Sequence, residues 1–148
     1  MLALHPSSAY EVDLAMEHIK HAQNDDMILF DRNYSSYRFL ASLIDLNIQF
    51  TGRCSRQSFK AAQRLFKQSV TDSSTVTLFA KGEVKKKCKK LGFPTKITVR
   101  FVRVRLSTGE IEVLVTSLLD EKQYTAHMFK ELQRKMFLRI STRKNIFL

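Results

Sequence analysis

The feature of this sequence that most constrains its fold is a short apolar run, Met27 to Phe30, bounded by acidic residues. Asp25 and Asp26 precede the run, and Asp31 follows it. Four apolar residues without polar alternation are typical of a strand that is buried on both faces. The run therefore predicts a covered sheet, with Asp31 at the C-terminal end of one of its strands.

The segments around this run predict a parallel arrangement. Helical spacing of apolar residues predicts a helix over about 9–23, and Ser35 or Ser36 can cap a second helix. Residues 48–53 alternate between apolar and polar and predict the next strand. Helix, strand, helix and strand in this order favour a parallel strand pair joined by crossover helices, and hence an α/β fold with a mixed sheet and flanking helices.

The second half of the chain is more basic and richer in strand patterns. Residues 54–70 predict a basic amphipathic helix, and residues 85–90, KKKCKK, are expected to form a lysine-rich loop. Strands are expected over 75–80, 96–106 and 110–118, with Ser107, Thr108 and Gly109 as a hairpin turn. Asp120 and Gln123 resemble a cap for a final helix.

Length and composition exclude several classes of protein. The chain has 148 residues, 44% of them hydrophobic, which suits one domain with its own core. No run approaches the length of a membrane span, and four scattered glycines cannot form a nucleotide-binding loop. Cys54 and Cys88 are expected to be reduced thiols in a cytoplasmic protein.

The charge is strongly uneven along the chain. The net charge is +11, but residues 1–31 hold six acids and one base, so residues 32–148 carry +16. The basic part predicts contact with a polyanion such as DNA or RNA. Arg100, Arg103 and Arg105 could face either water or phosphates.

Three stretches, taken in order, resemble bacterial insertion-sequence transposases of the DDE type. ILFDRNY from Ile28 is similar to the family's strand that ends in Asp-Arg-Gly-Tyr. ITVRFVRVRLSTGEIEVLVTSLLD from Ile97 resembles the family's β-rich insertion and the return from it, and YTAHMFKEL from Tyr124 resembles the approach to the helix that bears the last catalytic acid.

The resemblance implies a partial RNase H-like fold and a division of the chain into three parts. Residues 1–70 would form a partial core, residues 71–119 the β-rich insertion and return strand, and residues 120–148 a truncated final helix with a basic tail. It implies metal-dependent cleavage and strand transfer at insertion-sequence ends, with Mg²⁺ ions held by three acids. Asp31 would be the catalytic acid and metal ligand that this chain retains. The candidate DNA-binding residues are Arg32, Tyr34, Arg53, Arg56, Lys85, Lys86, Lys87, Lys89 and Lys90.

Departures from the family pattern change the expected activity. Only eight residues precede the first expected helix, so the strand that bears the first acid is expected to be missing. No acid follows Glu131, where the pattern requires a catalytic Glu. One carboxylate cannot position two metal ions, so we expect an inactive internal fragment of a transposase.

Two other interpretations fit the sequence. The chain could be a nonenzymatic nucleic-acid-binding module, which needs only the basic surface. It could also be a poorly folding product whose sheet exposes an unpaired edge because earlier strands are missing.

Overall fold

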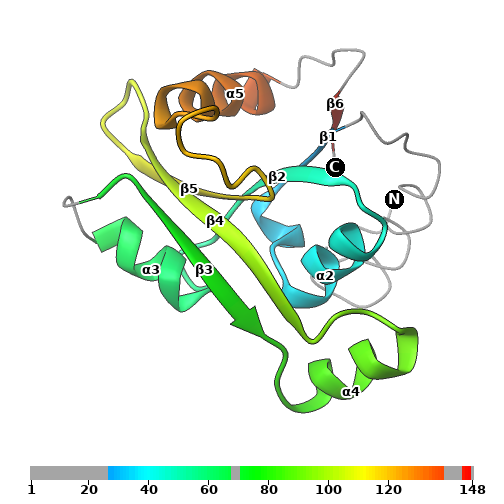
Figure 1. Cartoon of the computed structure of the whole chain (residues 1–148). Helices are drawn as coiled ribbons and strands as arrows, with labels where there is room; N and C mark the ends of the chain where they lie inside the picture. The colour runs from blue at the N-terminus through cyan, green and yellow to red at the C-terminus, as the bar shows by residue number, and fades with distance from the viewer. Residues whose placement is uncertain (1–26, 68–70, 139–144, 148) are drawn as a thin grey trace, which may run out of the picture.

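The computed structural model describes residues 27–67, 71–138 and 145–147, which build a mixed α/β fold around one sheet (Figure 1). The strand order is β3-β4-β5-β2-β1-β6. The strands are β1 (Met27–Phe30), β2 (Gln49–Arg53), β3 (Ser73–Phe79), β4 (Lys96–Arg105), β5 (Ile111–Thr116) and β6 (Asn145–Phe147). The strands β1, β2 and β6 run parallel, whereas β3, β4 and β5 pair antiparallel and join the parallel part where β5 meets β2.

Helices cover the two faces of the sheet and form two apolar clusters. The helices α2 (Tyr37–Asp45) and α3 (Lys60–Lys67) pack on one face, and α5 (Ala126–Leu138) packs on the other. Successive residues of β4 alternate between the two clusters, since Phe101 belongs to the first and Val102 to the second. This alternation follows from the two-residue period of a strand and fixes which side chains can reach each helix.

The close contact between β1 and β2 depends on a glycine. Phe30 lies opposite Gly52 in the parallel register, and its ring occupies the space where a side chain of residue 52 would lie. A Cβ atom at Gly52 would stand 1.9 Å from Cε1 of Phe30. Because Gly52 has no side chain, the ring of Phe30 can pack against that of Phe39, with 5.3 Å between the ring centroids. Both rings belong to the same apolar cluster.

The structure confirms most of the expected elements in its described ranges. The buried strand over 27–30, the helix after Ser36, the strand that ends at Arg53, their parallel pairing and the turn at 107–109 are all present. Ser36 caps α2 by accepting a hydrogen bond from the N–H of Phe39 at 3.3 Å. The mixed sheet with flanking helices is compatible with the expected partial RNase H-like fold, and the helix expected over 9–23 lies outside the described residues.

Two expectations were wrong. The lysine-rich segment is not a loop but the helix α4 (Gly82–Leu91). Asp120 does not begin a helix: its carboxylate accepts from the N–H groups of Lys122 and Gln123 in a turn, and α5 starts at Ala126. The strand β6 pairs with β1 over Met27–Leu29, so β3 and β6 are the edge strands of the described sheet. Within the described ranges, no helix is both long and apolar enough to cross a membrane.

Candidate functional site

Asp31 lies where β1 ends, and the backbone geometry there fixes its carboxylate. A short 3-10 helix, η1 (Arg32–Tyr34), follows immediately, and Asp31 is its N-terminal capping residue. Its Oδ1 atom accepts the N–H of Arg32 at 2.6 Å, and its carbonyl oxygen accepts the N–H of Tyr34 at 3.0 Å. Asp31 therefore caps η1, and this structural role does not depend on any catalytic role.

Arg53 brings a positive charge to the same carboxylate. Phe30 and Gly52 are opposite each other, so the next residues along β1 and β2, Asp31 and Arg53, emerge side by side. Nη2 of Arg53 donates to Oδ1 of Asp31 at 2.9 Å, with 18% and 34% of the two side chains exposed. Partial burial pushes the pKa of Asp31 upward, but the N–H of Arg32 and the Arg53 guanidinium outweigh it, so the pKa lies below its ordinary value.

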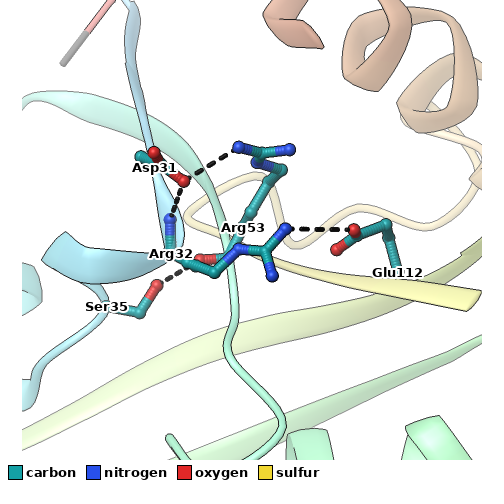
Figure 2. A network of polar contacts seen from close by, with 5 residues as sticks. All are labelled: Asp31, Arg32, Ser35, Arg53 and Glu112. Atoms are coloured by element: carbon teal, nitrogen blue, oxygen red, sulfur yellow. Dashed lines mark hydrogen bonds and ion pairs between the residues drawn. The ribbon is translucent and has the colours of Figure 1, made fainter.

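A second ion pair extends this cluster to β5. Nη2 of Arg32 lies 3.5 Å from Oε1 of Glu112, whose side chain is only 12% exposed (Figure 2). Ser35 donates its hydroxyl to the carbonyl oxygen of Arg53 and so ties the segment after η1 to the end of β2. Figure 2 shows the resulting group, in which each carboxylate faces its own guanidinium. We call Asp31, Arg32, Arg53 and Glu112 the charge cluster.

The charge cluster does not fit the Mg²⁺ centre that the family resemblance implies. Mg²⁺ requires several oxygen ligands in near-octahedral geometry, and two ions require several carboxylates. Here Oδ1 of Asp31 is already bound by Arg53 and by the N–H of Arg32, and Glu112 is paired with Arg32. In the ranges that the structure covers, no three His, Cys, Asp or Glu side chains meet in a way that could hold a metal.

The helix α4 presents a different kind of surface. Cys88 is its one buried residue and faces the core, while Lys85, Lys86, Lys87, Lys89 and Lys90 are all exposed. Gly92 ends the helix in the left-handed conformation, with φ of 76°, and its N–H returns to the last turn of the helix. The N–H of Phe93 also donates to the carbonyl oxygen of Cys88 at 2.8 Å. These hydrogen bonds fix the C-terminal end of the helix that bears the lysines. We call these five residues the lysine face.

The two groups of predicted site residues lie at opposite ends of β4. The helix α4 leads into Lys96, the first residue of β4, whereas Glu112 of the charge cluster is opposite Val104 near its last residue. Arg32 and Arg53 are engaged with carboxylates, and the ring of Tyr34 packs 5.7 Å from that of Phe39. The lysine face is therefore the largest exposed group among the predicted DNA-binding residues, although Lys86 also pairs with Glu83 at 3.3 Å.

Two further arginines have local partners that the sequence did not reveal. Arg56 is exposed, but its guanidinium lies 4.6 Å from the ring centroid of Phe66. Arg100 is 2% exposed, donates to the carbonyl oxygen of Tyr124 at 2.6 Å and lies 5.3 Å from the ring of Phe129. Arg100 therefore holds the segment before α5 to the sheet and does not face water or phosphates.

Comparison with known proteins assigns no family, because no family model matches the chain and the search of curated proteins finds no match.

Proposed function

We propose that this chain binds DNA through phosphate contacts of the lysine face and that it is a relative of DDE-type transposases that does not cleave DNA. The observation that carries the proposal is the arrangement of five exposed lysines on α4, with Glu83 as the one acid of that helix. A compact group of ammonium ions attracts the DNA backbone without reading its sequence. The relation to transposases rests on the ILFDRNY, β-rich and YTAHMFKEL stretches. A cytoplasmic location is part of the same proposal.

The charge cluster supports the noncleaving part of the proposal. A catalytic carboxylate in a two-metal site must offer its oxygens to the metal ions. Asp31 instead holds a guanidinium at 2.9 Å and caps η1. Arg53 and Arg32 neutralise the two carboxylates of the cluster, which lowers their attraction for a divalent cation.

The binding experiment compares two variants that lose the same charge. Lys86, Lys87 and Lys90 are replaced by Gln in one variant, and Lys60, Arg64 and Lys67 of α3 are replaced by Gln in its control. Fluorescence anisotropy with two unrelated labelled duplexes measures affinity over a salt series. Loss of three phosphate contacts should make the slope of log K against log salt shallower by about 2.7, for both duplexes alike. The α3 control should retain most of the slope.

Equal losses of affinity in the two variants would mean that affinity follows net charge and not the lysine face, and would contradict the proposal.

The claim that the chain does not cleave DNA has its own test, in which wild type and Asp31→Asn are incubated with duplex DNA and Mg²⁺. We expect no cleavage by either protein. Mg²⁺-dependent cleavage by the wild type that Asp31→Asn abolishes would support the second candidate, an active transposase core, which the place of Asp31 after a buried strand favours.

A further inference from the structure

The strand β3 ends the sheet on the side opposite β6, and the pairing with β4 shows which of its backbone groups face outward. Arg103 donates its N–H to the carbonyl oxygen of Asp72 at 2.7 Å, and Ala80 donates to Thr95 at 2.9 Å. Antiparallel pairing alternates, so the even-numbered residues between them bond to β4. The N–H and C=O groups of the odd-numbered residues, Ser73 to Phe79, therefore point away from the sheet.

Only one of these outward residues is satisfied locally. The Thr71 hydroxyl donates to the carbonyl oxygen of Ser73 at 2.9 Å and accepts its N–H at 3.4 Å. No hydrogen bond within the described ranges reaches the outward groups of Thr75, Thr77 or Phe79. Three consecutive outward residues thus offer three donors and three acceptors along one edge.

The side chains of β3 do nothing to block this edge. The strand reads SSTVTLF, with no charge, proline or glycine over seven residues. Natural edge strands usually carry a lysine, a proline or a bulge that prevents pairing with another chain. Phe79 is 59% exposed, and Thr75 and Thr77 are exposed beside it. This strand is built like one that is paired on both sides.

The two ends of β3 carry opposite charges. Asp72 precedes the strand, and the Ser73 hydroxyl donates to Glu121 at 2.7 Å; Arg100 also contacts Ser73 but is buried, so the exposed charges at the N-terminal end are acidic. At the C-terminal end, Lys81 and Lys85 outnumber Glu83, so this end is basic. In an antiparallel pair of identical strands, the acidic end of each copy lies beside the basic end of the other.

We propose that β3 is a self-association edge, through which two copies pair antiparallel about Thr77 into one continuous sheet. This register places Thr77 opposite its counterpart and Thr75 opposite Phe79, and it uses all the unsatisfied outward groups. A register centred on Val76 would instead pair Phe79 with Ser73, whose groups Thr71 already holds. The interface is isologous and closes as a dimer.

Sedimentation velocity over a concentration series tests this edge with a matched pair of variants. Thr77→Pro removes one outward N–H and leaves the pairing with β4 intact, whereas Thr77→Val keeps that N–H. We expect the wild type and Thr77→Val to form a dimer and Thr77→Pro to remain monomeric. A monomeric wild type, a dimeric Thr77→Pro, or wild-type species that grow beyond a dimer would each overturn the proposal.

A second pair of variants does not depend on how well the strand tolerates proline. Thr77→Lys places like charges opposite each other at the two-fold axis and should abolish the dimer, whereas Thr98→Lys, on the neighbouring strand and the same face, should weaken it less. Thr77→Cys should form a disulfide-linked dimer under mild oxidation, because Cys54 and Cys88 are buried and do not compete. Failure of Thr77→Cys to cross-link in a sample that sediments as a dimer would exclude this register.

Discussion

Arg53 binds Asp31 at 2.9 Å because the parallel register of β1 and β2 brings the two residues to neighbouring strand ends. Asp31 places its carboxylate at the end of a buried strand, and the register of β1 with β2 places the Arg53 guanidinium against it. A cation that approached Asp31 would compete with the positive charge of Arg53. The ion pair therefore weakens the attraction for a metal ion at the position that the family resemblance assigns to a metal ligand.

The pH dependence of stability should reveal this pair. The pKa of Asp31 is lowered in the folded protein, so its charged form stabilises the fold above the unfolded pKa of about 3.9 and loses this effect as pH falls through the folded value. Asp31→Asn should be less stable than wild type at pH 7, by less than about 1 kcal/mol because the pair is partly exposed. Chemical denaturation over a series of pH values from 7 into the acid range measures the gap in stability, which should narrow as the pH falls below the unfolded pKa.

Asp45→Asn is the matched control for this prediction, since it also removes one carboxylate, at the exposed C-terminal end of α2. A gap between wild type and Asp31→Asn that persists unchanged in acid would show that the ion pair contributes no stability.

Gly52→Ala should destabilise the fold by about 1–3 kcal/mol, because the new Cβ overlaps the ring of Phe30. Urea denaturation of Gly52→Ala, Phe30→Leu and the double variant gives the coupling between the two positions. The smaller Leu side chain relieves the overlap, so the double variant should lose less unfolding free energy than the sum of the losses in the two single variants. Strict additivity would mean that the ring does not occupy this space.

Arg100→Met should be much more destabilising than Arg105→Met, although the two arginines are on the same strand. Arg100 is buried, and its loss leaves the carbonyl oxygen of Tyr124 without its charged donor, which costs about 2–4 kcal/mol together with lost packing. Arg105 is exposed, so Arg105→Met should lower the free energy of unfolding by no more than about 0.5 kcal/mol. Thermal denaturation of both variants measures the difference, and similar losses would contradict a structural role for Arg100.

The thiol of Cys88 should report the opening of α4. Burial raises the pKa of Cys88 and raises that of Cys54 to about 12, so both should react slowly with a thiol reagent in the folded protein. Cys88 belongs to a peripheral helix, and it should react faster than Cys54 through local unfolding. Reaction rates in Cys54→Ala and Cys88→Ala separate the two thiols. DNA bound at the lysine face should slow the reaction of Cys88 alone.

The sequence predicted the elements that local patterns specify. The apolar run from Met27 to Phe30 is typical of a buried strand, and Ser35 or Ser36 before an apolar helical stripe indicated the start of α2. The helix α4 was missed because its lysines obscured a weak stripe, Val84, Cys88 and Leu91, at spacings of four and three residues. Gly92 directly after it was a second helix signal. Read together, these four residues would have predicted the helix.

The site could not be predicted in the same way, since its pairs join residues that are distant in sequence. Asp31 meets Arg53 through the register of β1 with β2, and Arg32 reaches Glu112 because β5 lies beside β2. Nothing local to Glu112 indicates this neighbour. The burial of Arg100 likewise depends on α5 crossing β4, which no periodicity within β4 encodes.

The division of the sheet into an antiparallel and a parallel half sets an order for its assembly. The strands β3, β4 and β5 come from the contiguous segment 73–116 and pair with their neighbours in the chain, whereas Met27 of β1 pairs with Asn145, 118 residues later. Short loops close at a lower entropic cost than long ones, so the antiparallel half can nucleate first and serve as a template onto which the parallel strands dock. Amide hydrogens of the β4–β5 hairpin should then gain protection earliest during refolding, and those that join β1 to β6 last.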